Sequence, residues 1–204
     1  MKLSRRLRAL AAALSLAAAV LAAPVSGQDF SNRSADDVDP GLRRALLDAV
    51  AASDSFVDEF DAEVWLTVNS LRLQDQVPNA DERFRILTTV HRHATHTGLP
   101  PELVLAVIDI ESNFDRYAIS SARALGLMQV MPFWVEELGL GEDHNVLFQI
   151  ESNILLGCRI LKYYLDMEDG DLVQALARYN GSTGLRWYAD RVLDRLRLKW
   201  YRQR

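Results

Sequence analysis

The amino-acid sequence predicts a mainly α-helical protein with one domain of ordinary size. Apolar residues recur at helical spacing along most of the chain from residue 41 onward. No segment shows the regular alternation of apolar and polar residues that is typical of a half-buried strand, and no internal repeat occurs. With 204 residues, the chain is long enough to bury a substantial apolar core.

Residues 1–27 are predicted to be a secretory signal peptide. A basic start is followed by an uncharged stretch rich in Leu, Ala and Val from residue 9 to residue 25, and then by small residues. This apolar stretch is shorter than a comfortable membrane span. We therefore expect export to the periplasm or cell envelope. The alternative is an uncleaved membrane anchor.

The charge and cysteine content of the chain argue against several kinds of site. Residues 1–27 hold four basic residues and no acidic one, so the remainder carries a net charge near −9, against −5 for the whole chain. Such an acidic chain lacks the basic footprint of a nucleic-acid-binding protein, and no nucleic-acid partner is expected. Residues 186–204 are rich in Lys and Arg, which predicts either peripheral contact with an anionic envelope component or a solvated helix face. A single cysteine, Cys158, excludes an internal disulfide and a zinc site built on cysteines.

Residues 28–80 are predicted to form a helical N-terminal extension. A polar lead-in is followed by two segments with helical spacing, "LRRALLDAVAASDSFVDEF" and "DAEVWLTVNSLRLQDQ". The main domain is expected over residues 81–204. Its first helix has Asp81 as the predicted N-cap and ends at Gly98.

The next helix is expected from Pro101 to Glu111, because proline is accepted in the first turn of a helix. At about 100° per residue, Glu111 shares a face with Val104 and Val107 and lies at the C-terminal end of that buried face. Asp109 points almost the opposite way, so the two carboxylates are not expected to act as a pair. After a loop poor in charge, further helices are predicted in "LMQVMPFWVEELGL", "NVLFQIESNILLGCRILKYYLDMEDG", "DLVQALARYNGSTG" and "LRWYADRVLDRLRLKWY".

The position of Glu111 predicts a carboxylic acid with a raised pKa. Burial and the negative end of a helix dipole both disfavour the ionised form. A carboxyl that is still protonated near neutral pH can donate its proton to a leaving sugar oxygen, as the acid of a glycosidase does. The alternative is a solvent-facing glutamate at a helix end, without a catalytic role.

Two stretches of the chain resemble the lytic transglycosylases of the soluble-lytic-murein type. They are "ESNFDRYAISSARALGLMQVMP" (residues 111–132) and "ALARYNGSTG" (residues 175–184). The similarity lies in the order and spacing of Glu-Ser-x-Phe, Ala-x-Ser, Gly-Leu-Met-Gln and a later Tyr-Asn turn, and it extends more thinly over residues 97–190.

This resemblance implies a lysozyme-like fold and cleavage of peptidoglycan between N-acetylmuramic acid and N-acetylglucosamine, without a metal or a cofactor. Glu111 matches the single acid/base of the family. It would protonate the glycosidic oxygen and then take the proton of the muramyl 6-hydroxyl, which closes a 1,6-anhydro ring. The substrate's acetamido group would shield the positive anomeric carbon, as in the substrate-assisted exceptions to the two-carboxylate rule.

Five further positions match the family's substrate-binding residues. Ser112 is expected to hydrogen-bond near the acid, and Met128 and Gln129 to line the groove beside the sugars. Tyr179 is expected to place its hydroxyl close to the acid, and Asn180 to shape the turn behind it. For Met128 and Tyr179 the alternative is a purely structural role in the core.

Three positions depart from the family's pattern. Arg123 precedes Ala124 where the family usually has Gly, and this changes the expected geometry of the loop. Arg178 precedes the Tyr-Asn turn where the family often has Ala, and it could project into the groove. Gln149 stands where Asp is common, which removes a helix-capping contact. We expect these changes to affect substrate preference more than the type of reaction.

We expect a monomeric enzyme whose partner is the peptidoglycan strand. A close alternative is a hydrolase of the goose-lysozyme kind, which uses water on the same scaffold. An alternative from another class is a peptidoglycan-binding or assembly module without activity. The histidines of "HRHATH" (residues 91–96) are not expected to form a metal site, because no third ligand stands at zinc-like spacing.

Overall fold

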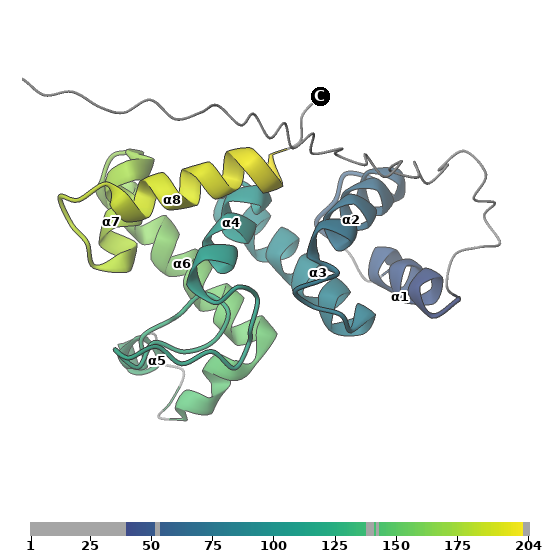
Figure 1. Ribbon diagram of the computed structural model, residues 1–204, viewed down its shortest axis with the longest axis horizontal. Helices are drawn as coiled ribbons and strands as arrows, with labels where there is room; N and C mark the ends of the chain where they lie inside the picture. Colours follow the sequence, from purple (N-terminus) through teal and green to yellow (C-terminus); the bar gives the residue numbers. More distant parts are fainter. Residues whose placement is uncertain (1–39, 52–53, 138–140, 142, 202–204) are drawn as a thin grey trace, which may run out of the picture. The chain divides into compact units, whose positions relative to one another are not determined.

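The computed structural model describes residues 40–51, 54–137, 141 and 143–201. The predicted signal peptide, residues 1–27, lies outside this range. The described part of the chain forms eight α-helices, a 3-10 segment and a π-helical segment (Figure 1): α1 (Pro40–Ala51), α2 (Glu59–Leu73), α3 (Ala80–Thr97), α4 (Pro101–Glu111), α5 (Phe133–Glu137), η3 (His144–Phe148), α6 (Ile150–Met167), α7 (Leu172–Asn180), α8 (Trp187–Arg195) and η4 (Leu196–Trp200). No strand is present in these ranges, apart from isolated bridges at Leu125, so the predicted mainly α fold is confirmed.

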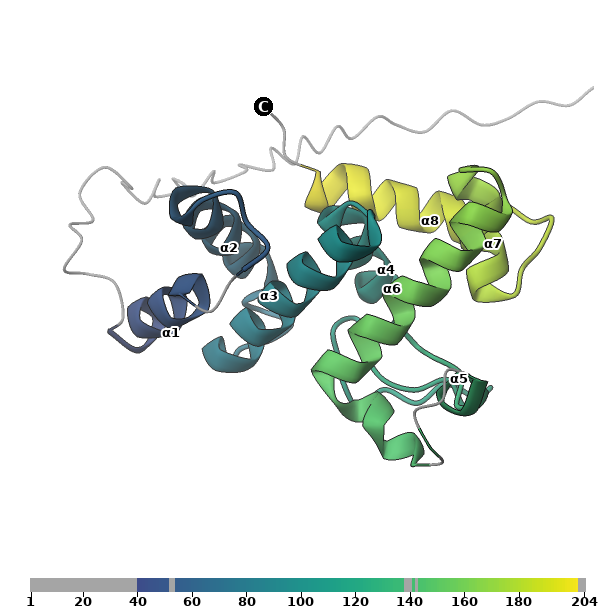
Figure 2. The same ribbon diagram turned by 180° about the vertical axis from the view of Figure 1, so that it is seen from behind.

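Helix α4 is the central helix of the fold (Figures 1 and 2). It contacts α3 on one side and α8 and η4 on another. Every side chain from Leu103 to Asp109 is buried. A helix that is surrounded on all sides has no need for a one-sided apolar pattern, and the sequence "LVLAVID" accordingly holds only one polar residue. The bounds of α4 agree with the predicted helix Pro101–Glu111.

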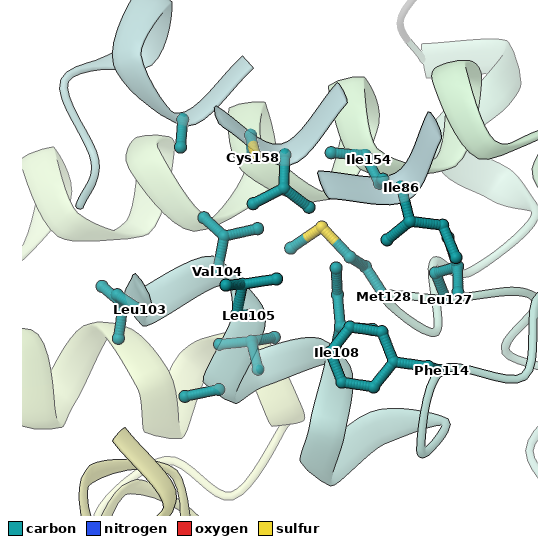
Figure 3. Packing of buried hydrophobic residues seen from close by; sticks show 14 of the residues in the cluster. Ile86, Leu103, Val104, Leu105, Ile108, Phe114, Leu127, Met128, Ile154 and Cys158 are labelled. Carbon is teal, nitrogen blue, oxygen red and sulfur yellow. The ribbon is translucent and has the colours of Figure 1, made fainter. Parts of the chain in front are cut away.

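The core around α4 draws side chains from α3, α6 and the loop that follows α4. Figure 3 shows Val104 and Ile108 of α4 near Met128 of that loop and Cys158 of α6. Cys158 is fully buried and unpaired, and burial raises the pKa of its thiol to about 12. It is therefore an unreactive core residue.

Helices α1 and α2 pack on the same core as the rest of the described chain. Leu66 and Leu73 of α2 are fully buried. The indole Nε1 of Trp65 donates a hydrogen bond to Glu102 at the start of α4, at 2.8 Å. Helices α1 and α2 therefore lie before residue 81 and share this core with the helices that follow. The predicted domain boundary at residue 81 stays a prediction. Of the helices in the described ranges, none has the length and apolar character required to cross a bilayer.

Two element boundaries differ from the prediction. The N-cap of α3 is Asn79, whose side chain accepts a hydrogen bond from the N–H of Glu82 at 2.8 Å. The predicted cap, Asp81, instead lies in the first turn, where its charge is favourable near the positive end of the helix dipole. Helix α5 begins only at Phe133, because residues 125–130 form a tight loop closed by a bridge from Leu125 to Val130. Gly98 ends α3 in the left-handed conformation, as expected.

Candidate active site

Glu111 is the last residue of α4, and its carboxyl is half-buried. The Oε1 atom of this carboxyl accepts a hydrogen bond from the hydroxyl of Tyr188 at 2.5 Å. Burial raises the pKa of Glu111 to about 7, while the Tyr188 hydrogen bond and the charge of Arg191 oppose that rise. The predicted direction of the shift is confirmed. Near neutral pH, Glu111 therefore exists in comparable amounts as acid and as carboxylate.

Tyr188 holds the Glu111 carboxyl from the opposite helix, α8. Its side chain is only 1% exposed, and burial together with the Glu111 charge raises the pKa of its hydroxyl well above the usual range. Tyr188 therefore remains protonated and can act as a hydrogen-bond donor at any pH at which the protein works. Because Oε1 receives this bond, Oε2 is the oxygen that is free to carry the proton of the neutral acid. Tyr188 was not among the predicted site residues.

Tyr179 lies in the last turn of α7, close enough to Glu111 for the carboxylate charge to raise the pKa of its hydroxyl, after the larger effect of burial. Its hydroxyl donates a hydrogen bond to the carbonyl of Met128 at 2.7 Å. Tyr179 therefore joins α7 to the loop after α4. The direct bond to the acid comes from Tyr188, so a role of the Tyr179 hydroxyl toward substrate stays a prediction.

The loop after α4 is held by the buried side chain of Asn153, which comes from α6. The Oδ1 atom of Asn153 accepts a hydrogen bond from the N–H of Met128 at 2.7 Å. Its Nδ2 atom donates to the carbonyls of Leu125 and Leu147, at 2.9 and 2.8 Å. Gly126 fits against this amide with a φ of +75°, and a Cβ at that position would lie 2.2 Å from the Leu147 carbonyl oxygen. Only glycine adopts this positive φ readily and also leaves room for the Leu147 carbonyl oxygen.

Ser112 and Gln129 fix the two ends of this loop. The hydroxyl of Ser112 donates a hydrogen bond to the Leu127 carbonyl at 2.8 Å, which joins the loop to the residue next to Glu111. The side-chain amide of Gln129 donates to the carbonyls of Ala118 and Gly126, at 3.2 and 2.9 Å. Both side chains are half-buried, and their expected contacts with substrate stay predictions.

Asp109 lies away from Glu111, as the helical geometry predicts, and its side chain is fully buried. One carboxylate oxygen accepts a hydrogen bond from Arg195 at 2.6 Å. The other lies 2.9 Å from the Lys199 ammonium and 3.0 Å from the Trp200 indole nitrogen. This carboxylate is committed to joining α4 to α8 and η4, so Glu111 has no second carboxylate as a partner on α4.

Comparison with known proteins places this geometry in a family. Residues 89–191, just over half of the chain, match the Transglycosylase SLT domain. The chain belongs to this family. The match includes Glu111, the loop after α4, Tyr179 and Tyr188, and the SLT domain is lysozyme-like, which confirms the expected fold.

Two relatives of this chain carry the name "Membrane-bound lytic murein transglycosylase C". One is from Yersinia pestis (strain Pestoides F) and the other from Yersinia pseudotuberculosis serotype O:1b (strain IP 31758). Each is 32% identical to this chain over 124 residues, which cover 53% of this chain and 35% of the relative. The chain thus spans about a third of the length of these curated relatives.

Met128 of the SLT domain is a core residue, and the prediction that its side chain lines a groove is wrong. The side chain is fully buried, and Figure 3 shows its sulfur among the labelled core residues. Gly157 of α6 leaves the space that this sulfur occupies, because a Cβ at Gly157 would lie 2.3 Å from the Met128 Sδ atom. The backbone of Met128 is what serves the site, since its carbonyl accepts the Tyr179 hydrogen bond.

The turn after α7 has the form that the family motif predicts. Asn180 is the last residue of the helix, and Gly181 ends it with a φ of +78°. The contact of Asn180 with the site stays a prediction. The guanidinium of Arg178 is paired with the Glu168 carboxylate at the end of α6, and its projection into a groove stays a prediction. Gln149 caps the start of α6 without a side-chain hydrogen bond, as its departure from Asp predicts.

Most of the basic C-terminal residues are paired within the chain. Arg195 and Lys199 bind Asp109. Arg186 pairs with Asp190, and Arg197 with Asp194. Arg202 and Arg204 lie outside the described residues. Intramolecular pairing therefore leaves less charge for an anionic envelope component than the sequence alone indicates.

The histidines of residues 91–96 take part in packing and ion pairing. His91 stacks on Phe56 with ring centroids 3.5 Å apart, and burial lowers the pKa of His91 to about 4. His93 contacts a Glu151 carboxylate oxygen at 2.5 Å. Within the described ranges, no three metal-ligating side chains come together.

Proposed function

We propose that this protein is a peptidoglycan lytic transglycosylase that cleaves the bond between N-acetylmuramic acid and N-acetylglucosamine. The observation that carries this proposal is the carboxyl of Glu111, which has a pKa of about 7 in a domain of the SLT family. The names of its relatives support murein as the substrate class.

In the first step, the neutral Glu111 acts as the general acid. Its Oε2 proton passes to the glycosidic oxygen as the bond from that oxygen to the anomeric carbon breaks. The substrate's acetamido oxygen stabilises the positive charge at the anomeric carbon. The new carboxylate is stabilised by the hydrogen bond from Tyr188 and by the charge of Arg191.

In the second step, the Glu111 carboxylate acts as the general base. It takes the proton of the muramyl 6-hydroxyl, and the oxygen of that hydroxyl attacks the anomeric carbon. A 1,6-anhydro ring forms, Glu111 is neutral again, and no water is consumed.

The arrangement of carboxylates supports a mechanism with one acid/base. Retaining and inverting glycosidases use two carboxyl groups that face the sugar, roughly 5 to 9.5 Å apart. In this chain the nearest carboxylate on α4, Asp109, is buried on another side of the helix and ion-paired. A substrate-assisted reaction does not need that second carboxylate.

We also propose that the enzyme acts as a monomer in the periplasm or cell envelope. The signal-peptide pattern of residues 1–27 supports this location. Helices α1 and α2 would buttress α3 and α4 through contacts such as that of Trp65 with Glu102.

The test is digestion of purified murein, followed by mass spectrometry of the products. Wild-type protein should release fragments that are lighter by one water than hydrolytic fragments. Glu111→Gln, which keeps shape but cannot exchange the proton, should slow release by a factor on the order of 10²–10⁴. The surface variant Asp190→Asn should retain the wild-type rate.

Other outcomes would identify the alternatives. Products with an ordinary reducing end would indicate a hydrolase of the goose-lysozyme kind. Murein binding without cleavage by the wild type would indicate a binding module, and equal rates for wild type and Glu111→Gln would exclude Glu111 as the acid.

A further inference from the structure

The loop between α4 and α5 carries one charged residue in a long neutral stretch. From Tyr117 to Val135 the only charged side chain is that of Arg123. This side chain is exposed, and its backbone has a φ of +68°, a conformation that side chains other than glycine rarely adopt. The resemblance to the SLT family gives glycine as the usual residue here. This chain therefore places a long cation where a glycine would fit the backbone best.

Arg123 lines a hollow of about 550 Å³. Ser120, Ser121 and His144 line the same hollow with it, and its apolar wall comes from Ile119, Leu125, Pro132 and Phe148. The Nε2 atom of His144 lies 3.4 Å from the carboxylate of Glu136. No acidic residue is in the lining. A hollow lined by an arginine, a histidine, hydroxyl groups and apolar side chains suits an anionic group attached to a larger, partly apolar ligand.

Within the described ranges, the guanidinium of Arg123 forms no ion pair or hydrogen bond. The nearby Arg116 differs, because it pairs with Glu82 and donates to the Phe148 carbonyl. The cation at position 123 is thus available to a ligand, in a protein that has more acidic than basic residues.

The backbone that carries Arg123 is held in place by its own turn. Its N–H donates to the Ser120 carbonyl at 2.9 Å, and the Ser120 hydroxyl accepts a hydrogen bond from the Ala124 N–H at 2.9 Å. The same loop continues to Leu127, which Ser112 ties to the end of α4. The loop that lines the hollow is therefore tied to the residue next to Glu111.

We propose that Arg123 is a specificity residue that binds a carboxylate of the peptide-bearing murein strand in this hollow. The inference rests on the proposed function and goes beyond it, because it predicts a preference for charged over neutral strands. A guanidinium binds a carboxylate through two parallel hydrogen bonds, which the neutral loop around it cannot provide. The stem peptides of murein present such carboxylates, and a strand without stems presents those of the lactyl groups.

The test compares untreated murein with murein whose carboxylates are converted to amides by carbodiimide and ammonia. Wild-type protein should have a kcat/KM about tenfold higher on untreated murein, mainly through KM. Arg123→Gly should lose most of this preference and keep its kcat, because glycine adopts the required φ without strain. Arg123→Lys should retain part of the preference, and Arg85→Gln, on the exposed face of α3, should behave as wild type. A stem-free strand, whose carboxylates are those of the lactyl groups, distinguishes the two sources. The preference for untreated over amidated strands should persist there if a lactyl carboxylate is bound, and it should be lost if a stem-peptide carboxylate is bound.

Equal kcat/KM values for wild type on the two mureins, or an unchanged preference in Arg123→Gly, would overturn the inference. Cosedimentation with insoluble murein provides a second readout that needs no catalysis. Wild-type protein should bind untreated murein more tightly than amidated murein, and Arg123→Gly should not discriminate. If no variant cleaves any murein but this binding difference is present, the catalytic proposal fails and the carboxylate site stands.

Discussion

The Glu111 carboxyl is subject to two opposed influences. Burial favours its neutral form, and the Tyr188 hydrogen bond and the Arg191 charge favour its ionised form. The resulting pKa of about 7 suits the proposed mechanism, in which this group first gives a proton and then takes one. Because that mechanism requires the neutral acid in the free enzyme, kcat/KM should be constant at low pH and fall as the pH rises through about 7.

Tyr188→Phe tests this balance directly. Loss of the hydrogen bond removes a contact that stabilises the ionised carboxylate, so the pKa of Glu111 should rise. A bond to a charged group contributes about 1.5 kcal/mol, which corresponds to about one pKa unit. The alkaline limb of the pH profile should therefore move to higher pH by about one unit, together with a lower kcat. In Tyr179→Phe, whose lost bond is to a backbone carbonyl, the limb should move less. An alkaline limb that stays in place in Tyr188→Phe would contradict this account.

At the scale of the elements, the site depends on the loop between α4 and α5. One buried amide, Asn153, satisfies three backbone groups of that loop and of η3. Glycine at positions 126 and 157 allows the loop to approach α6 closely. The carbonyls of this loop then receive the hydroxyls of Ser112 and Tyr179.

Asn153→Leu should lower both stability and activity. The substitution leaves one buried N–H and two carbonyls without their partner, which should cost about 3 kcal/mol of unfolding free energy. Urea unfolding measures this loss, and amide hydrogen exchange at residues 125–130 should become faster. The control is Asn145→Ala, an exposed position, with an expected change within about 0.5 kcal/mol. Equal stabilities for the two variants would show that the loop is held by other contacts.

At the scale of the whole molecule, α4 separates two carboxylates that have different tasks. Glu111 faces α7 and α8 with a pKa near neutrality, whereas Asp109 binds Arg195, Lys199 and Trp200 from the C-terminal segment. The C-terminal helix α8 is therefore bound to α4 at two points. Its Arg195 pairs with Asp109, and its Tyr188 donates a hydrogen bond to Glu111.

Asp109→Ala should destabilise the protein strongly. Removal of one partner from a buried ion pair costs about 3–5 kcal/mol, because charged groups are left without compensation. Thermal or urea unfolding should show this loss, while Asp190→Ala, which removes an exposed i,i+4 pair with Arg186, should cost less than about 0.5 kcal/mol. At a temperature where the variant is folded, the alkaline limb of its pH profile should stay near that of the wild type. If the alkaline limb of the Asp109→Ala profile moved as far as that of Tyr188→Phe, Asp109 would have a role in catalysis and not only in stability.

The residues that were predicted well are those whose surroundings are local. The bounds of α4 follow from its proline start and its apolar run, and the raised pKa of Glu111 follows from its place at the end of a buried face. Met128 was assigned to the wrong environment, because its space in the core depends on a glycine of another helix, Gly157. Tyr188 was missed, since it lies 77 residues from Glu111 and no short pattern links the two.

The sequence by itself determined the helical class and the family motif, and it predicted a raised pKa for Glu111, because hydrophobic period, proline and glycine act over a few residues. Only the tertiary structure decided which hydroxyl binds Glu111, which carboxylate is a structural anchor and which arginine lines a hollow without an ion pair to any described residue. These outcomes depend on contacts between side chains of helices that are far apart in the sequence. Such contacts are fixed by the packing of the whole core.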